Sequence, residues 1–104
     1  MGRTQREKPA RLGEKLLQIR TALGLSQSEM LRHLGLEDRL QRDDISKYER
    51  GVREPSLLVL LAYADKANVY VDALIDDRRD LPAELPSSVR HEGVRHVPSG
   101  RRRR

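Results

Sequence analysis

Residues that end helices divide this chain into short segments. Gly24, Gly35, Gly51 and Asn68 each close a stretch in which apolar residues recur three and four positions apart. Glycine and, among the other residues, asparagine readily accept the left-handed backbone conformation with which many helices end. Nothing between residues 12 and 77 alternates between polar and apolar side chains as a half-buried strand would. The sequence therefore predicts an all-α fold built from short helices.

The first two helices have clear boundaries in the sequence. One is expected over residues 11–23, because its leucines and isoleucine form a single stripe. Ser26, with Glu29 three residues later, is the pattern of a capping box. We expect this box to open a second helix that runs to about Leu34 and ends at Gly35.

Three more helices are expected after a charged connection. The third places Ile45 and Tyr48 on its inner face and ends at Gly51. The fourth follows Pro55-Ser56, runs to Asn68 and is apolar on nearly every side, which is typical of a buried central helix. A short fifth helix is expected over residues 71–75.

Charge is distributed unevenly along the chain. The net charge is +5, but residues 12–77 carry more acids than bases, so the positive charge lies at the two ends. We expect a flexible basic arm over 1–10, a folded domain over 11–77, and a Pro- and Arg-rich tail over 78–104 that is disordered beyond about residue 90. Basic arms of this kind either contact nucleic acid phosphates or aid solubility.

Several classes of protein are excluded or disfavoured. Cysteine is absent, which rules out disulfides, Cys-based zinc sites and thiol nucleophiles. No apolar run is long enough for a membrane span or a signal peptide, so we expect a cytoplasmic protein that does not contact membranes. His33, His91 and His96 have no spacing that indicates a shared metal, and no phosphate-binding glycine loop or nucleophile motif occurs. We therefore expect no cofactor, no metal and no enzymatic activity.

Six short motifs occur in a characteristic order: Leu25-Ser26-Gln27, Leu34-Gly35, Ile45-Ser46, Glu49-Arg50-Gly51, Pro55-Ser56-Leu57 and Val71-Asp72-x-Leu74. Over residues 12–75 they resemble the phage repressor and Cro-like, or XRE-type, helix-turn-helix regulators. The resemblance implies a compact five-helix, lambda-repressor-like domain whose second and third helices form the DNA-binding motif. It also implies a sequence-specific transcriptional regulator of double-stranded DNA, with repression as the expected effect.

The resemblance also indicates which side chains face DNA. It matches Ile45 to the family's buried apolar position, so that Arg42, Asp43, Ser46 and Lys47 point outward toward base edges. Arg42 and Lys47 can donate to guanine, and Asp43 can accept from cytosine, which favours a half-site that contains G·C pairs. Alternatively, Asp43 or Asp44 is the N-cap of the third helix.

Four further residues are expected to contact phosphates. Gln27 lies at the start of the second helix, where free backbone N–H groups attract anions. Arg39, Arg50 and Arg53 flank the third helix, although an ordinary solvated arginine is the alternative for each. In the family, the residues at Arg20 and Glu49 commonly form a structural ion pair, and a partly buried carboxylate is costly without a partner.

The chain departs from the family at three places. The connection over residues 36–44 is several residues longer than usual, so it forms either an extended loop or an extra helical turn through 36–40. Leu31 stands where the family prefers a small residue. Tyr70 replaces a frequent serine cap, and we expect its ring to pack in the fold or at a dimer contact.

Assembly and alternative functions remain expectations. A homodimer on a palindromic operator is expected, because dimers of this motif bind half-sites about 34 Å apart. The fifth helix and an apolar strip over residues 81–89 are the expected dimer surface, although this strip also suits packing on the domain itself. An antitoxin-like or coactivator-like module with a protein partner is the main alternative, favoured by the acidic domain, and RNA binding by the tail is a third.

Overall fold

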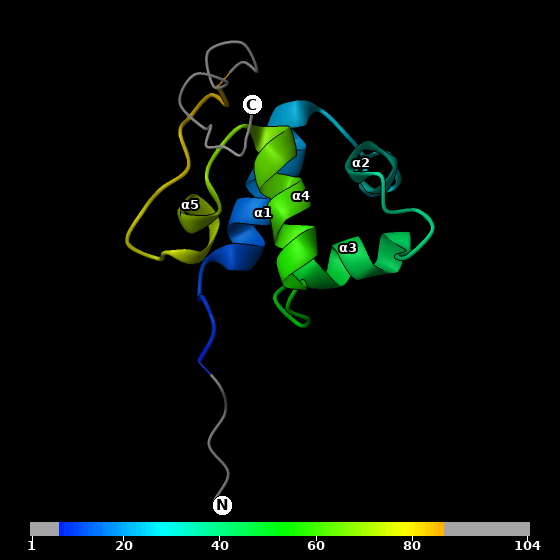
Figure 1. Ribbon diagram of the computed structural model, residues 1–104, viewed down its shortest axis with the longest axis horizontal. Helices are drawn as coiled ribbons and strands as arrows, with labels where there is room; N and C mark the ends of the chain where they lie inside the picture. Colours follow the sequence, from blue (N-terminus) through cyan, green and yellow to red (C-terminus); the bar gives the residue numbers. More distant parts are fainter. Residues whose placement is uncertain (1–6, 87–104) are drawn as a thin grey trace, which may run out of the picture.

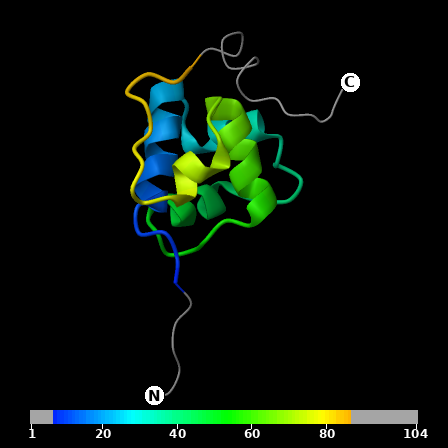
Figure 2. The ribbon, with the colours of Figure 1, turned by 60° about the vertical axis from the view of Figure 1, so that its left-hand side comes forward.

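Five α-helices account for the regular structure in the computed structural model, which describes residues 7–86. They are α1 (Leu12–Leu23), α2 (Gln27–Leu34), α3 (Arg42–Glu49), α4 (Leu57–Ala67) and α5 (Val71–Ile75). Helices α1 and α4 lie at the centre, with α2 and α3 on one side of them and α5 on the other (Figures 1 and 2). No strand occurs within residues 7–86. The prediction of a five-helix, all-α domain is confirmed.

The predicted helix ends are present in the structure. The Ser26 hydroxyl accepts a hydrogen bond from the Glu29 N–H (3.0 Å), and the Glu29 carboxylate accepts one from the Ser26 N–H (2.8 Å). These bonds hold the pKa of Glu29 below its usual value. Gly24 and Gly35 adopt left-handed φ angles of 73° and 74°, and Asn68 adopts 59°. Local backbone chemistry therefore sets the end of α1, both ends of α2 and the end of α4.

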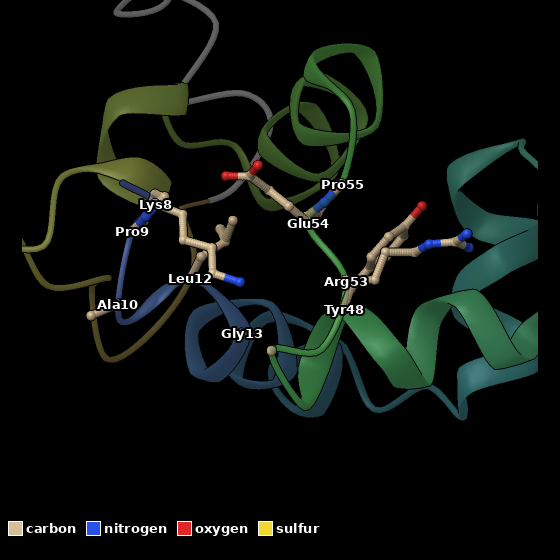
Figure 3. Close-up of a pocket in the computed structure, with 10 residues that line it drawn as sticks. Lys8, Pro9, Ala10, Leu12, Gly13, Tyr48, Arg53, Glu54 and Pro55 are labelled. Atoms are coloured by element: carbon tan, nitrogen blue, oxygen red, sulfur yellow. The ribbon is translucent and has the colours of Figure 1, made fainter. Parts of the chain in front are cut away.

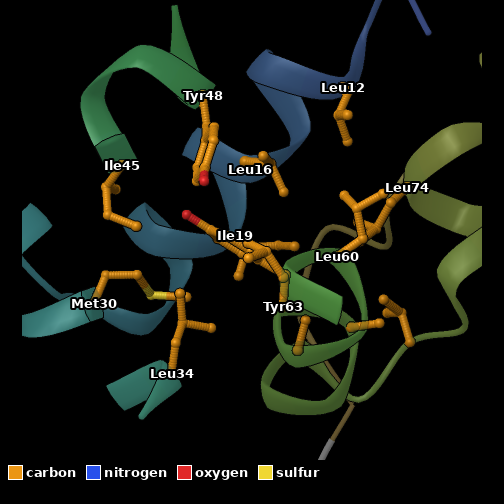
Figure 4. Close-up of a cluster of buried hydrophobic side chains, with 14 of the residues drawn as sticks. Leu12, Leu16, Ile19, Met30, Leu34, Ile45, Tyr48, Leu60, Tyr63 and Leu74 are labelled. Atoms are coloured by element: carbon orange, nitrogen blue, oxygen red, sulfur yellow. The ribbon is translucent and has the colours of Figure 1, made fainter. Parts of the chain in front are cut away.

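A single hydrophobic core joins all five helices (Figure 4). The stripe of α1 contributes Leu16 and Ile19, both fully buried, and Tyr63 of α4 reaches the centre of the core. Burial raises the pKa of Tyr63, and its hydroxyl has no hydrogen-bond partner among residues 7–86. The buried apolar residues are Leu12, Leu16, Ile19, Met30, Leu31, Leu34, Ile45, Tyr48, Val59, Leu60, Tyr63, Ala64, Ala67, Val69, Leu74 and Leu81.

The expectation for α4 was wrong in one respect. Leu60 and Tyr63 are buried, but Leu57 and Leu58 are 81% and 67% exposed, and Leu61 is 44% exposed. These leucines are exposed because α1, α2 and α5, which pack against α4 within the described chain, leave one side of its first two turns in contact with water. Helix α4 is therefore apolar on a face that its own domain does not use.

The chain after α5 packs back onto the domain. Leu81 is 7% exposed within the core, Leu85 packs against that core, and the Asn68 side chain donates to the Pro86 carbonyl (2.9 Å). Of the two roles expected for the apolar strip, Leu81 and Leu85 take the packing role within their own domain. Residues 87–104, including Val89 and the expected disordered tail, lie outside the described residues, as do residues 1–6 of the N-terminal arm.

Hydrogen bonds and an ion pair, which we call the ionic clasp, join the start of α1 to Asp77 and Asp80 after α5. The Asp77 carboxylate accepts hydrogen bonds from the N–H groups of Ala10 (2.8 Å) and Arg11 (3.0 Å), so it caps α1 from a distant part of the chain. These two bonds are the main cause of the lowered pKa of Asp77. The Arg11 guanidinium donates to the Asp77 carbonyl (2.9 Å) and to the Asp80 carboxylate (2.6 Å). The end of the N-terminal arm is thereby attached to the domain.

Lys15 is a buried cation beneath this clasp. The residue is 1% exposed, and its Nζ donates to the carbonyl oxygens of Ala73 and Asp76, each at 2.9 Å. These carbonyls lie at the end of α5, where a positive charge is favourable because the carbonyl groups of a helix end are only partly satisfied.

No helix within residues 7–86 is long and apolar enough to cross a membrane.

Candidate nucleic-acid interface

The connection between α2 and α3 contains one helical turn. The N–H groups of Arg39 and Leu40 both donate to the Leu36 carbonyl at 2.9 Å. Leu36 and Leu40 are partly buried and pack against the core. Of the two forms expected for this longer connection, the structure has the helical turn, because the two leucines anchor its ends and leave Arg39 exposed between them.

Helix α3 begins at Arg42, with Gln41 as its N-cap residue. The Asp44 carboxylate accepts a hydrogen bond from the Gln41 N–H (2.9 Å). The alternative that Asp43 or Asp44 is the N-cap was therefore wrong. Asp44 lies in the first turn and reaches back, which is the role of an acid at the third helical position.

The inner and outer faces of α3 differ sharply. Ile45 is completely buried and Tyr48 is 5% exposed. Arg42 and Asp43 are exposed on the opposite side, and Ser46 and Lys47 are half-buried. All four predicted base-contact residues thus lie away from the core. All four side chains on this outer face are polar or charged.

Three of these four residues, Asp43, Ser46 and Lys47, each form a side-chain ion pair or hydrogen bond. Lys47 Nζ lies 3.1 Å from Asp43 Oδ2, one turn away, and Arg50 Nε donates to the Ser46 hydroxyl (3.2 Å). Exposed pairs of this kind contribute at most about 1 kcal/mol and exchange readily for other partners. Arg42 is different, since it has no ion pair or hydrogen bond to any residue that the structure describes.

Arg53 lies in the loop after α3 and forms an ion pair with Asp44. Its side chain is 54% exposed, whereas that of Asp44 is 17% exposed. Besides accepting from the Gln41 N–H, Asp44 thus has a role that the sequence did not reveal: it holds Arg53 beside the same helix. The remaining N–H groups of Arg53 stay available because a guanidinium has five donors.

Glu49 joins three helices beneath the outer face. Its side chain is 5% exposed and accepts from Arg20 Nε (2.7 Å), Arg20 Nη2 (3.1 Å) and Gln27 Nε2 (3.1 Å). The bond to Glu49 raises the pKa of Arg20. The expected pair of Arg20 and Glu49 is present, whereas sequence reasoning missed the bond from Gln27. One amide hydrogen of Gln27 is therefore used inside the protein rather than being free for a phosphate.

A close crossing of α1 and α3 fixes the depth of α3 in the domain. A Cβ atom added at Gly13 would lie 2.8 Å from the Glu49 carbonyl oxygen and 3.0 Å from that of Tyr48. Both distances are too short for ordinary contacts, so only glycine fits. This crossing was not predicted, because a glycine inside a helical pattern carries no sign of what lies opposite.

The N-terminal segment passes the C-terminal end of α3. A cavity of about 310 Å³ lies between residues 8–10 and the loop after α3, and Lys8, Tyr48 and Arg53 are among the residues that line it (Figure 3). In Figure 1 the segment before α1 leaves the lower edge of the domain, beneath α1 and α5. Residues 8–10 of the basic arm therefore lie beside the loop that follows α3.

Within residues 7–86, no group of three or more His, Asp or Glu side chains could hold a metal ion. His33 is exposed on α2, and Asp76 binds Arg78 and Arg79, which strongly lowers the pKa of Asp76. The acidic pair at 76–77 thus serves the fold.

Comparison with known proteins identifies the family. A family model described as helix-turn-helix matches residues 16–74, which is more than half of the chain and runs from α1 to α5. No curated protein matches the chain, and no solved structure matches it either.

Proposed function

The chain belongs to the helix-turn-helix family of the XRE, or Cro and phage-repressor, type, and from this premise we propose that it is a sequence-specific repressor. Domains of this family bind DNA and are not enzymes. The proposal adds that α3 enters the major groove of a palindromic operator. In this motif the second helix reads base edges while the first helix crosses the phosphate backbone.

The observation that carries the proposal is the contrast between the two sides of α3. Its inner side is held by Ile45, Tyr48, the Glu49 junction and the crossing at Gly13. Its outer side carries polar side chains that form only exchangeable contacts. A rigid helix with a free polar face loses little conformational entropy when it enters a groove, which favours specific recognition.

Four residues are the proposed base contacts. Arg42 is exposed and unpaired within the described chain, so it can make a bidentate contact to guanine. Lys47 can also donate to guanine once it leaves Asp43. Asp43 can accept from the amino group of cytosine, and Ser46 can bind either kind of edge. The half-site would therefore contain G·C pairs.

Gln27, Arg39, Arg50 and Arg53 are the proposed phosphate contacts. Arg39 is exposed on the turn before α3, and Arg53 is held beside α3 by Asp44. Gln27 keeps one amide hydrogen and lies at the start of α2, where backbone N–H groups are free. Such contacts set affinity and orientation without reading the sequence.

Selection of bound sites from a random pool of DNA duplexes tests this proposal. Wild-type protein is expected to select one palindromic motif, and Arg42→Ala and Lys47→Ala are expected to relax it at separate base pairs. Arg32→Ala, which removes an exposed arginine of α2 that we assign to no DNA contact, is the matched control. If both α3 variants select the wild-type motif unchanged, the recognition residues are assigned wrongly.

An antitoxin-like or coactivator-like interaction module is the second candidate function. The acidic excess over residues 12–77 favours it, because like charges repel phosphate. A salt series separates the candidates: a specific regulator keeps its sequence preference as salt rises, whereas binding through the basic ends falls steeply and without preference.

A further inference from the structure

An ion pair on the outer face of α3 places a hydrogen-bond acceptor beside a hydrogen-bond donor. Lys47 Nζ lies 3.1 Å from Asp43 Oδ2. The two residues are four positions apart in the helix, so their side chains lie on the same side of it. The side chain of Asp43 is 61% exposed and that of Lys47 is 41% exposed. The pair is therefore open to a further partner on the side of α3 that faces away from the core.

The neighbouring charges do not compete for this pair. Asp44, the other acid in the first turn of α3, accepts from the Gln41 N–H and forms an ion pair with Arg53. Within residues 7–86, Asp43 is therefore the acid that pairs with Lys47. The structure thus joins Asp43 and Lys47 as one unit, separate from the contacts of Asp44.

Both members of the pair keep hydrogen-bonding capacity. A lysine ammonium has three N–H donors, so Lys47 keeps two of them after its bond to Asp43. An ionised carboxylate accepts at about four positions, so Asp43 keeps several. The paired side chains therefore offer one acceptor next to two donors, at a separation of one hydrogen bond.

A G·C base pair presents the complementary arrangement in the major groove. Cytosine offers its N4 amino group as a donor, and guanine offers O6 and N7 as acceptors. Cytosine N4 and guanine O6 are hydrogen-bonded to each other, so they lie ~2.9 Å apart. This spacing is close to the 3.1 Å between Asp43 Oδ2 and Lys47 Nζ. An A·T pair has its donor between two acceptors, so it does not match one acceptor beside two donors.

We infer that Asp43 and Lys47 read one G·C base pair together, as an intact ion pair. Asp43 accepts from cytosine N4, and Lys47 donates to guanine O6 and N7. This inference rests on the proposed function and deepens it, because there each residue reads a base by itself. Asp43 is the specificity-determining member: if the base pair were reversed or replaced by A·T, its carboxylate would face an acceptor and be repelled.

The ion pair is expected to stay intact in the groove. Exclusion of water strengthens the attraction between opposite charges and raises the cost of a charge without a partner. If Lys47 left Asp43 for another base pair, the carboxylate would remain near the phosphates without its cation. Contact with a single base pair avoids this cost, because each side chain keeps its partner and gains a base.

Selection of bound sites from random duplexes, with the full chain, tests the inference. Asp43→Ala and Lys47→Ala are each expected to lose the base preference at one position of the motif, and at the same position. The control is Asp72→Ala on α5, which removes the acid of another exposed pair, 3.8 Å from Arg79. This helix lies on the other side of α1 and α4 from α3 (Figure 1), so the wild-type motif is expected. Loss of preference at two different positions would overturn the inference.

A double-mutant cycle measures the coupling between the two side chains. The measured quantity is the affinity for the selected site divided by the affinity for a site with this one G·C pair reversed. Each single variant is expected to lower the ratio at least about tenfold. The double variant Asp43→Ala/Lys47→Ala is expected to lower it no further, because either change already breaks the unit. Losses that multiply in the double variant would show independent action and contradict the inference.

Exchange of the two residues gives a test that keeps the net charge of α3. The variant Asp43→Lys/Lys47→Asp retains a pair at the same spacing, with donor and acceptor in the opposite order. It is expected to prefer the reversed base pair at this position of the motif. A folded exchange variant that keeps the wild-type preference would contradict the shared reading of one base pair.

Failure of this inference is distinguishable from failure of the proposed function. A wild-type protein that selects no motif would refute the proposed function, and the inference with it. A selected motif that Asp43→Ala and Lys47→Ala relax at different positions would refute only the shared reading. In that case the proposed function would stand, with each residue reading its own base.

Discussion

The outward faces of α3 and α4 are both exposed, yet they differ in chemistry. Helix α3 presents Arg42, Asp43 and Lys47, whereas α4 presents Leu57 and Leu58 with no charge nearby in the helix. Exposed charges exchange one partner for another at small cost, but exposed leucines are stabilised only when they leave water. The difference teaches that one fold can present two surfaces of opposite chemistry, one whose charges suit DNA in our proposal and one whose leucines remain in contact with water in the single domain.

The two faces also differ in what supports them. The α3 face depends on polar contacts between helices at Glu49 and on the crossing at Gly13, whereas the α4 face rests on the apolar residues of the core beneath it. A change under α3 should therefore disturb DNA binding and leave the packing beneath the α4 face intact. The following predictions test that separation, and the largest expected effect comes first.

Glu49→Ala is expected to have the largest effect. It leaves the Arg20 guanidinium and the Gln27 amide without their acceptor in a largely buried place, which should lower the free energy of unfolding by about 3 kcal/mol. Urea unfolding measures this change, with the exposed Glu37→Ala as control. DNA affinity should fall as well. Wild-type stability and wild-type DNA affinity together would show that the junction does not support α3.

Arg42→Ala is expected to have the second-largest effect, and this effect is on DNA binding alone. Loss of a bidentate base contact should weaken binding to the selected operator by about 1–3 kcal/mol, with no change in melting temperature because Arg42 is exposed. Arg53→Ala is the variant to compare with it. This change should weaken binding to all duplexes alike and lower the slope of log affinity against log salt concentration by about one released counterion. Fluorescence anisotropy at several salt concentrations separates these outcomes, and identical behaviour of the two variants would contradict the assignment.

Gly13→Ala tests the crossing of α1 and α3. Alanine inside a helix is normally about 1 kcal/mol more favourable than glycine. Here the added methyl group would meet backbone carbonyls of α3, and overpacking costs about 1–3 kcal/mol, so a net loss of about 1 kcal/mol is expected. Thermal unfolding gives the sign of the change. A stabilised variant would mean that α3 moves away from α1 without cost.

The ionic clasp is expected to give the smallest effect, and it depends on pH. The pKa of Asp77 is lowered in the folded protein by the N–H groups of Ala10 and Arg11. A carboxyl with a lowered folded pKa stabilises the fold above its unfolded pKa, near 4, and this contribution is lost as the pH falls through the folded value. Melting temperature should therefore fall below about pH 4, and Asp77→Asn should reduce that slope. Parallel pH profiles for the two proteins would exclude a contribution from the clasp.

Local chemistry explains why the helix boundaries were predictable. Gly24, Gly35 and Asn68 act through backbone conformation, and Ser26 and Glu29 act through hydrogen bonds between neighbours in sequence. The stripe of α1 and the buried side of α3 follow from helical periodicity. Each of these signals lies within one or two turns, so the sequence contains it in full.

The features that were missed join residues far apart in the chain. The bond from Gln27 to Glu49, the approach of Gly13 to α3 and the cap that Asp77 provides for α1 span many residues. The pair of Arg20 and Glu49 was expected only because the family has it. The α4 face was misread for the same reason: periodicity shows that a helix is apolar all round, but not which side lacks a neighbour.

The sequence by itself determined the five helices, most of their ends and the side of α3 that faces outward, because short-range backbone and side-chain preferences encode these, and its motifs identified the family. Only the tertiary structure decided where Asp44 and Gln27 are used, that Leu81 belongs to the core, and that Leu57 and Leu58 are left in water. The physical reason is that burial and pairing depend on which surfaces meet. That is settled when the helices pack against one another, and not along the chain.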